Sequence, residues 1–329
     1  MDFIKIPTKG MRDIMPDEMA LREYIINQLC ETYSLYGFKR IETPCVEHIE
    51  NISNNQGGEN EKLIFKILKR GEKLDLENYK NVDDLVDSGL RYDLTVPLTR
   101  YYANNMNNLD NPFKSIQIGN VWRADRPQKG RFRQFVQCDI DIFGEKTDLA
   151  EIELISATTS FLDKIGLNNY KIVINDRRIL KAMALYAGFK EEECDSVFIS
   201  LDKMDKIGIE GVRKELIANE FNELCINKYL SLYSMDDCSN LTKFCEQIEN
   251  SFLDQKIVEN LKDIITSVTN MKDTNIEFDP TLVRGMSYYT GPIFEIKVCG
   301  YNGSIGGGGR YDEMVSKYAN VSVPACGFS

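Results

Sequence analysis

Hydrophobic and aromatic residues recur at helical spacing between residues 17 and 36, and a glycine follows them. The apolar positions in this stretch are Leu21, Tyr24, Ile25, Leu29, Tyr33 and Tyr36. Glycine is common directly after a helix because it adopts the left-handed conformation without a steric cost. The pattern therefore predicts an amphipathic helix over residues 17–36 that ends at Gly37.

The next segment, residues 38–47 (FKRIETPCVE), has the composition of a strand with a proline inside it. Proline has no backbone N–H group, so it cannot donate a ladder hydrogen bond in a central strand. Pro44 therefore indicates the edge of a sheet or an interface. A shorter strand-like pattern follows at residues 63–68, within a mixed and partly acidic stretch over residues 58–90.

Two stronger strand patterns occur at residues 115–124 (SIQIGNVWRA) and 132–143 (FRQFVQCDIDIF). The residues between them, 125–131 (DRPQKGR), are basic and include no large apolar side chain. Two such strands joined by a short polar loop are typical of an antiparallel hairpin, which we predict here.

The rest of the chain predicts a further helix, several strands and a long helical segment. Residues 149–165 form an amphipathic helical pattern before Gly166, and residues 170–175 (YKIVIN) form a strand pattern. Helical periods and dense charges dominate residues 177–272, and strand patterns return after Thr281. We therefore predict an α+β fold, a mainly antiparallel sheet flanked by helices. A helical insertion at 177–272 divides its core into residues 1–176 and 273–329.

The two faces of the predicted strand at 132–143 differ strongly. Side chains on a strand alternate between faces, and one face is mostly apolar. The other face carries Arg133, Phe135, Gln137, Asp139 and Asp141. Burying this polar row requires partners, so it either faces solvent or lines a polar ligand site. Arg123 and the basic loop would suit phosphate, and the carboxylates would suit an ammonium or imidazole group.

Composition restricts the candidate chemistry further. The 329 residues include nine scattered cysteines, one histidine (His48) and no Cys-x-x-Cys pair, so we expect neither a zinc site nor a disulfide framework. The net charge of −11 means that any RNA contact needs a local basic patch. Apolar runs are too short to cross a membrane, and the N-terminus lacks the apolar core of a signal peptide. We expect a cytoplasmic protein without membrane contact.

Several segments, in order along the chain, carry a resemblance to a known family. They are residues 37–47 (GFKRIETPCVE), 91–95 (RYDLT), 119–144, 282–295 (LVRGMSYYTGPIFE), 305–312 (IGGGGRYD) and 324–329 (PACGFS). The first and third resemble motifs 1 and 2 of the class II aminoacyl-tRNA synthetases, and the last resembles the start of motif 3. The others resemble segments peculiar to histidyl-tRNA synthetases. The resemblance to this family implies histidine, ATP with Mg²⁺, and tRNA(His) as substrates and cofactors.

The resemblance implies roles for individual residues in the activation of histidine. Arg123 would bridge the α-phosphate of ATP and the histidine carboxylate, and Arg284 would contact the same phosphate from the other side. Two fixed cations at one phosphorus would stabilise the transition state without a protein nucleophile. Phe135 would stack on adenine. The other ATP-binding residues that the resemblance implies are Asp125, Arg131 and Arg133, and the loop at 126–130 would meet the acceptor end of the tRNA.

A pocket for histidine follows from the same resemblance. The residues that would hold the amino group are Asp93, Thr95 and Gln137, and those around the imidazole ring are Asp141, Tyr288, Tyr289 and Tyr311. A site that bonds both ring nitrogens rejects analogues that lack them. The glycines at 306–309 are not followed by the Lys-Ser or Lys-Thr of a phosphate-binding loop. We predict that they let the backbone approach histidine, and that Arg310 and Asp312 are structural.

The resemblance also implies features beyond residue 329. Motif 3 of the family continues past the equivalent of Ser329 to an arginine, and an anticodon-binding domain follows. We therefore expect a truncated catalytic core, weakly active or inactive alone, that forms homodimers through the segment around Pro44.

Two classes of non-catalytic relative share the fold and are alternatives. They are the regulatory subunit of ATP phosphoribosyltransferase and a kinase-linked sensor domain for uncharged tRNA. Such proteins tend to lose the site arginines and the tyrosine-rich signature. Arg123, Arg284, Tyr288 and Tyr289 are all present here, which favours the synthetase.

Overall fold

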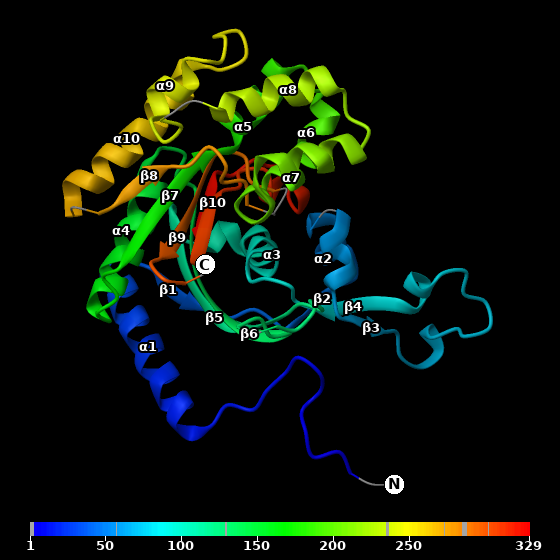
Figure 1. Cartoon of the computed structure of the whole chain (residues 1–329). Coiled ribbons are helices and arrows are strands. Elements are labelled where there is room, and N and C mark those ends of the chain that lie inside the picture. The colour runs from blue at the N-terminus through cyan, green and yellow to red at the C-terminus, as the bar shows by residue number, and fades with distance from the viewer. Residues whose placement is uncertain are drawn as a thin grey trace. The chain divides into compact units, whose positions relative to one another are not determined.

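The computed structural model describes residues 3–56, 58–128, 130–234, 237–272, 274–284, 288–301 and 303–329. The chain forms two compact units (Figure 1). Unit 1 comprises residues 1–144, 313–323 and 329, and unit 2 comprises residues 145–312 and 324–328. Several segments named above include residues outside this description. The loop at 126–130 and the segment at 119–144 contain residue 129, the insertion contains 235 and 236, and the segment at 282–295 contains 285–287. The core range 1–176 also contains 1, 2, 57 and 129, and the core range 273–329 contains 273, 285–287 and 302.

The centre of unit 1 is the long antiparallel hairpin that the sequence predicts, formed by β5 (Phe113–Trp122) and β6 (Gln134–Phe143). β1 (Lys39–Ile41) pairs with β5 in parallel. A second sheet has the antiparallel order β2 (Val46–His48), β4 (Val86–Leu90), β3 (Lys66–Leu68). The predicted strand at 38–47 is therefore two short strands in two sheets, with Pro44 in the connection between them.

The helices of unit 1 cover these strands. The α-helices are α1 (Pro16–Leu35), α2 (Ile49–Gln56) and α3 (Thr95–Asn105), and the 3-10 helices are η1 (Gly58–Leu63), η2 (Gly71–Lys73), η3 (Val82–Leu85), η4 (Met106–Asn108) and η7 (Val315–Lys317). Gly37 follows α1 with a φ of 81°, which confirms the predicted left-handed helix end. The ring of Tyr102 in α3 stacks on that of Phe143 at 4.5 Å, so α3 packs against the hairpin.

Unit 2 contains a mainly antiparallel sheet. Its strands lie in the order β11 (Ala325–Phe328), β10 (Ser304–Arg310), β9 (Pro292–Val298), β7 (Tyr170–Asp176) and β8 (Ile276–Phe278). Only the β7–β8 pair is parallel among these described strands. α4 (Leu149–Lys164) and α10 (Gln255–Lys272) lie side by side (Figure 1). These elements confirm the predicted α+β class for the chain.

Within the described part of residues 177–272, every regular element is helical, as predicted. They are α5 (Arg177–Ala187), η5 (Glu191–Glu193), α6 (Cys194–Leu201), α7 (Met204–Ala218), α8 (Glu223–Ser231), η6 (Leu232–Ser234), α9 (Leu241–Cys245) and α10. Aromatic contacts hold several of these helices together, including an edge-on contact between Phe189 and Tyr229 at 5.7 Å. Across the described ranges, no helix has the length and apolar character of a membrane span.

The glycines of β10 let neighbouring strands pack closely. A Cβ atom on Gly308 would lie 1.9 Å from the carbonyl oxygen of Gly327 in β11. A Cβ atom on Gly309 would lie 2.5 Å from the carbonyl oxygen of Pro292 in β9. Packing within the sheet therefore requires glycine at these two positions. The close approach of this backbone to histidine stays a prediction.

We predict that Gly308→Ala lowers the free energy of unfolding by about 3 kcal/mol or more, because the added methyl group meets backbone that cannot move aside. Urea denaturation followed by circular dichroism measures this change. Gly37→Ala is the control: Gly37 has nothing within 4 Å of the added Cβ, so only its left-handed backbone is strained, at about 1 kcal/mol. Equal losses for the two variants would contradict the packing argument.

Candidate active site

The polar row of β6 lies on one face of the hairpin opposite residues of β5. The directly opposed pairs on this face are Ser115–Asp141, Gln117–Asp139, Gly119–Gln137 and Val121–Phe135. Asp139 and Asp141 are each 2% exposed, and Ser115 is fully buried. The carboxylate end of the row is therefore buried, which excludes the alternative of a wholly solvated face.

Asp139 is a strongly perturbed carboxylate of this face. Its Oδ1 accepts a hydrogen bond of 2.5 Å from the hydroxyl of Ser329. Burial raises the pKa of Asp139 well above its usual range, and the nearby charges of Asp141 and Asp93 raise it further. The Ser329 hydrogen bond and the charge of Arg123 only partly offset these effects. This end of the hairpin therefore favours a positively charged ligand.

Gln137 offers a hydrogen-bond acceptor next to Asp139. Its amide nitrogen donates to the Ser329 hydroxyl at 3.0 Å. Its Oε1 is buried and has no hydrogen-bond donor among the described residues, and the same holds for the hydroxyl of Ser115. Buried polar atoms without a partner are costly in a folded protein, and a bound ligand is one way of satisfying them. An ammonium group would supply donors for such acceptors.

The segment at 91–95 is held rigidly beside the hairpin. Arg91 is buried and donates to the carbonyl oxygens of Thr43 at 2.7 Å and Asn120 at 2.8 Å. A Cβ atom on Gly119 would lie 2.2 Å from Nη2 of Arg91, so this arginine lies on bare strand backbone. Asp93 accepts a hydrogen bond of 3.0 Å from the backbone N–H of Val96, which anchors it to the first turn of α3.

Thr95 is the first residue of α3, and its side chain is largely buried. Its carbonyl oxygen accepts a hydrogen bond of 2.8 Å from the hydroxyl of Thr99. Asp93, Thr95, Gln137 and Asp141, which the sequence assigns to the amino group and the ring of histidine, thus all lie in unit 1.

Arg123 follows β5 and contacts two aromatic rings. Its guanidinium carbon lies 4.3 Å from the centre of the Tyr92 ring and 5.2 Å from that of Phe135. Its Nε donates to the carbonyl oxygen of Tyr92 at 3.1 Å. These contacts hold a half-buried cation in one orientation through cation–π attraction and a hydrogen bond. Stacking of adenine on Phe135 stays a prediction.

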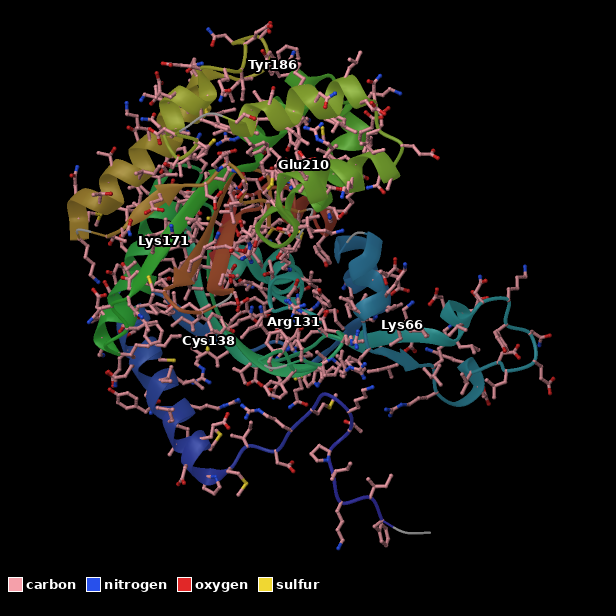
Figure 2. All side chains as sticks on the ribbon, viewed as in Figure 1. Lys66, Arg131, Cys138, Lys171, Tyr186 and Glu210 are labelled. Carbon is pink, nitrogen blue, oxygen red and sulfur yellow. The ribbon has the colours of Figure 1, made fainter. Side chains whose placement is uncertain are left out.

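The basic loop after Arg123 bends back on itself. The backbone N–H of Arg131 donates to the carbonyl oxygen of Gln128 at 2.9 Å, and Nη1 of Arg131 lies 3.9 Å from Oδ1 of Asp125. Arg131, labelled in Figure 2, is 58% exposed in its side chain. Arg133 is tied by its Nε to the carbonyl oxygen of Asp125 at 3.0 Å. The loop therefore presents two exposed arginines, Arg126 and Arg131, and the restrained Arg133 follows it.

Arg284 in unit 2 has an unusual backbone and a close carboxylate partner. Its φ is 60°, in the left-handed region that few non-glycine residues adopt. Its Nη1 lies 2.7 Å from Oε1 of Glu295, and its side chain is 20% exposed. Burial lowers the pKa of Arg284, but Tyr289 and Glu295 raise it by more, so the guanidinium stays protonated.

The three predicted pocket tyrosines lie together in unit 2. The rings of Tyr288 and Tyr289 are 4.8 Å apart, and those of Tyr288 and Tyr311 are 5.9 Å apart. All three residues are at most 8% exposed. Burial raises the pKa of Tyr289 and Arg284 lowers it, with a net rise, so its phenol stays neutral at physiological pH.

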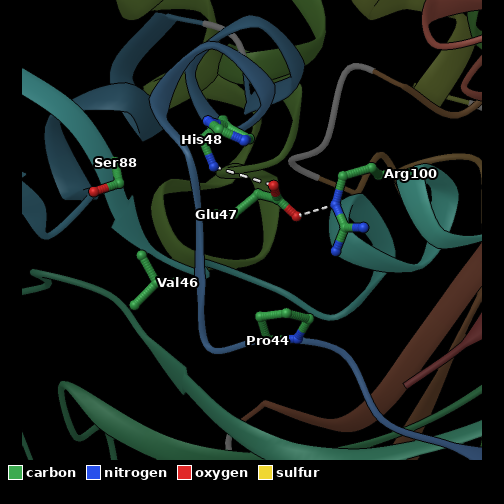
Figure 3. A pocket seen from close by; sticks show the side chains of 6 residues that line it. All are labelled: Pro44, Val46, Glu47, His48, Ser88 and Arg100. Carbon is green, nitrogen blue, oxygen red and sulfur yellow. Dashed lines mark hydrogen bonds and ion pairs between the residues drawn. The ribbon is translucent and has the colours of Figure 1, made fainter.

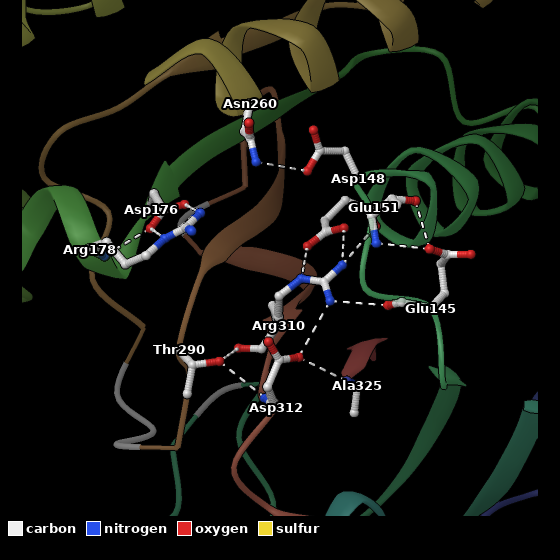
Figure 4. A network of polar contacts seen from close by, with 11 residues as sticks. Glu145, Asp148, Glu151, Asp176, Arg178, Asn260, Thr290, Arg310, Asp312 and Ala325 are labelled. Atoms are coloured by element: carbon white, nitrogen blue, oxygen red, sulfur yellow. Dashed lines mark hydrogen bonds and ion pairs between the residues drawn. The ribbon is translucent and has the colours of Figure 1, made fainter. Parts of the chain in front are cut away.

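Arg310 lies in a buried network that Figure 4 shows. Its Nε and Nη2 both pair with Glu151 at 2.7 Å, and its remaining bonds reach the carbonyl oxygens of Glu145 and Thr147 and the side chain of Asp312. Asp312 also accepts a hydrogen bond of 2.9 Å from the backbone of Ala325. These contacts support the structural role that we predict for Arg310 and Asp312.

A cavity of about 270 Å³ opens beside β2 in unit 1 (Figure 3). Its lining residues are Pro44, Val46, Glu47, His48, Ser88 and Arg100. The buried carboxylate of Glu47 pairs with Nε of Arg100 at 2.5 Å and accepts from the backbone N–H of His48 at 3.1 Å. Pro44 and Val46 are exposed.

The predicted site residues thus fall into two groups, one in each unit. The residues that lie in unit 1 are Asp93, Thr95, Arg123, Asp125, Arg131, Arg133, Phe135, Gln137 and Asp141, and those that lie in unit 2 are Arg284, Tyr288, Tyr289 and Tyr311. Three further residues contact the predicted site residues or lie between them on β6 and were not predicted: Asp139, Ser329 and Glu295. Side chains alternate between the two faces of β6, so Asp139 lies on the same face as Gln137 and Asp141, between them. This alternation is the sequence feature that could have identified Asp139.

Solved structures share this fold. The crystal structure of histidyl-tRNA synthetase from Nostoc sp. PCC 7120 matches with a TM-score of 0.80 and 28% identity, covering 99% of this chain and 73% of that chain. A structure described as an ATP phosphoribosyltransferase regulatory subunit/histidyl-tRNA synthetase from Bacillus halodurans C matches with a TM-score of 0.81 and 23% identity, covering 100% of this chain and 81% of that chain. This second likeness shows the fold alone. The α+β fold of class II aminoacyl-tRNA synthetases is confirmed.

Sequence comparison identifies the family. A family model described as histidyl-tRNA synthetase matches residues 10–329. The histidine--tRNA ligase of Leifsonia xyli subsp. xyli is 44% identical over 334 residues, which cover 98% of this chain and 77% of that protein. A probable histidine--tRNA ligase of Tropheryma whipplei is also 44% identical, over 98% of this chain and 78% of that protein. The chain belongs to the histidyl-tRNA synthetase family.

We predict that Asp139→Asn stabilises the ligand-free chain at pH 8. A carboxyl group whose pKa is raised by folding stabilises the fold at low pH, and this contribution is lost as pH rises through the raised pKa. Asparagine keeps an acceptor for Ser329 and carries no charge. The thermal midpoint should rise by about 2–4 °C at pH 8, as expected for roughly 1 kcal/mol, with no gain near pH 4.

Differential scanning calorimetry at the two pH values measures this difference. Glu277→Gln is the control, because Glu277 is a half-exposed carboxylate paired with Lys171 at 2.7 Å, and its midpoint should change little at either pH. A lower thermal midpoint for Asp139→Asn than for the wild type at pH 8 would show that the ionised carboxylate of Asp139 does not destabilise the fold.

Proposed function

We propose that this chain activates histidine with ATP to form histidyl-adenylate and pyrophosphate, and then transfers the histidyl group to tRNA(His). The observation that carries this proposal is the polar face of β6 in unit 1. There a buried carboxylate with a raised pKa, Asp139, and an acceptor without a donor, on Gln137, lie within electrostatic range of the fixed cation Arg123. An amino acid carries both an ammonium and a carboxylate, so it can match both charges.

The ammonium group of histidine is the ligand that we assign to the carboxylate end of this face. Asp93, Thr95 and Gln137 would hold it, with Asp139 as a further negative charge nearby. A bound ammonium group offsets the repulsion that raises the pKa of Asp139, because it supplies the missing positive charge. Binding of histidine should therefore lower the pKa of Asp139.

The ATP phosphates are the ligands that we assign to the arginines. A carboxylate oxygen of histidine would attack the α-phosphorus, an α-phosphorus–oxygen bond would form, and the bond to the leaving pyrophosphate would break. Both reactants are anions, so the reaction needs positive charge that is already in place. Arg123 and Arg284 would supply that charge. Arg131, Arg133 and Asp125 would position the nucleotide, with Phe135 against the adenine.

Magnesium would arrive with the triphosphate. Over the described ranges, no three or more His, Cys, Asp or Glu side chains gather where they could hold a metal ion. Phosphate oxygens and water would therefore supply most of its ligands, as is usual for magnesium bound to nucleotides. The bound ion would neutralise charge on the leaving pyrophosphate.

A carboxylate and phenol groups would recognise the imidazole ring of histidine. We assign it to Asp141 and to Tyr288, Tyr289 and Tyr311. The neutral phenol of Tyr289 can donate a hydrogen bond to a ring nitrogen, and a carboxylate can accept one from a ring N–H. An amino acid without ring nitrogens could not form these hydrogen bonds, and a site that depends on them discriminates against it.

The basic loop after β5 is the part of unit 1 that we assign to the acceptor end of tRNA. Arg126 and Arg131 are exposed there, whereas the whole chain carries a net charge of −11. Local positive charge of this kind is what an acidic protein needs to contact a phosphate backbone.

We predict that the chain catalyses histidine-dependent exchange of pyrophosphate into ATP. Arg123→Ala and Arg284→Ala should each lower kcat/KM about 100-fold or more, because each removes a charge that stabilises the transition state. Lys171→Ala removes a cation from an exposed ion pair and should leave exchange unchanged. Calorimetry should show that histidine binds and that phenylalanine does not. Exchange that is equally fast with other amino acids would contradict the proposed specificity.

We also infer a homodimer that uses the segment around Pro44. Pro44 and Val46 line the cavity beside β2, and Val46 is 47% exposed. The resemblance to the family assigns the dimer interface to this segment, and both side chains are accessible to a partner there. The partner would be a second copy of this chain.

We predict that Val46→Asp shifts the chain from dimer to monomer in analytical ultracentrifugation, because a charge buried in an interface costs several kcal/mol or more. Ile199→Asp is the matched control: Ile199 lies on α6 and is 55% exposed. A chain that is monomeric at all concentrations, or that dimerises equally well with Val46→Asp, would contradict this interface.

A further inference from the structure

The guanidinium of Arg284 lies on strand backbone that has no side chain. A Cβ atom on Gly307 would lie 2.0 Å from Nη1 of Arg284 and 2.7 Å from its guanidinium carbon. Any other residue at position 307 would therefore displace the arginine. Arg284 reaches this position with a left-handed φ of 60°, a conformation that non-glycine residues adopt only when other contacts hold them there.

Glu295 provides the contact that holds Arg284 from the neighbouring strand. In the β9–β10 ladder Glu295 is directly paired with Gly307. Its Oε1 lies 2.7 Å from Nη1 of Arg284, and its side chain is 18% exposed. A Cβ atom on Gly307 would also lie 3.1 Å from Cγ of Glu295. Arg284, Gly307 and Glu295 therefore form one closely packed cluster.

A comparison with Arg310, in the same unit, separates a structural arginine from one that can bind a ligand. Nε, Nη1 and Nη2 of Arg310 all donate to protein acceptors. In contrast, Nε of Arg284 is buried and has no acceptor among the described residues. Glu295 holds Arg284 through one nitrogen and leaves at least one buried donor for a ligand.

We propose that Glu295 and Gly307 form a cradle that aims the guanidinium of Arg284 at the α-phosphate. Glu295 is a positioning residue: it acts through Arg284 and touches no reacting atom. Without its carboxylate, a left-handed residue with a long flexible side chain would sample several orientations, and the charge would no longer be in place when the phosphorus reacts. This inference rests on the proposed function.

The test is a double-mutant cycle on the full chain, with single-turnover formation of histidyl-adenylate as the readout. Glu295→Gln keeps the shape of the side chain and removes its charge. It should lower the rate of adenylate formation about tenfold, while the dissociation constant of histidine changes by less than about twofold. In the Arg284→Ala background, Glu295→Gln should change the residual rate by less than about twofold, because its effect passes through Arg284.

Two further variants make the result decisive. Glu277→Gln removes a carboxylate from the same sheet without a contact to Arg284, and it should leave the rate unchanged. Glu295→Asp keeps the charge but shortens the side chain by one methylene, so its rate should fall between those of wild type and Glu295→Gln. It also replaces Glu295→Gln in the cycle if circular dichroism shows that variant to be unfolded.

The outcomes separate the cradle from the function on which it rests. A wild-type rate for Glu295→Gln, or a full additional loss in the Arg284→Ala background, would overturn the cradle and leave the proposed function intact. A wild-type chain that binds neither histidine nor ATP would instead contradict the proposed function. Weaker histidine binding with an unchanged rate would show that Glu295 acts on the amino-acid pocket, and would also overturn the cradle.

Discussion

The ion pair between Arg310 and Glu151 is the interaction on which the order of unit 2 depends most. Glu151 is fully buried, and burial raises the pKa of its carboxyl while Arg310 lowers it. A buried charge is tolerated when its partner satisfies it at close range, and here the guanidinium contacts both carboxylate oxygens. The pair joins β10 to α4, and through Asp312 it also fixes the backbone of Ala325 at the start of β11. Tyr311, next in sequence to Arg310, donates its backbone N–H to the carbonyl oxygen of Ala325 at 2.7 Å.

A second constraint acts on two arginines, whose planar guanidinium groups lie against glycine backbone. Arg91 lies on Gly119 and Arg284 lies on Gly307, at distances that leave no room for a Cβ atom. Arg123 instead lies against aromatic rings. In each case the surroundings restrict the guanidinium before any ligand binds. Little side-chain conformational entropy is therefore lost during binding or reaction. The glycines at positions 119 and 307 are therefore as important for the positions of these positive charges as the arginines themselves.

Local patterns in the sequence were sufficient for the main elements. The alternation of β6 predicted both the hairpin and its polar face, and Gly37 and Gly166 ended helices with left-handed φ values of 81° and 78° as expected. Membership of the histidyl-tRNA synthetase family, inferred from six segments, is confirmed. Contacts between distant positions could not be predicted: Ser329 bonds Asp139 across 190 residues, and Arg91 reaches Thr43 across 48. Nothing in the local sequence records such pairs, because they exist only once the strands are assembled.

We propose above all that Arg123 and Arg284 act on the same phosphorus. A crystal structure of the chain with a non-hydrolysable histidyl-adenylate analogue tests it most directly. The account predicts that both guanidinium groups lie within hydrogen-bond distance of the group that replaces the α-phosphate, with the ammonium of the analogue near Asp93 and Gln137. An analogue bound with either arginine turned away from that group, or bound elsewhere on the chain, would contradict it.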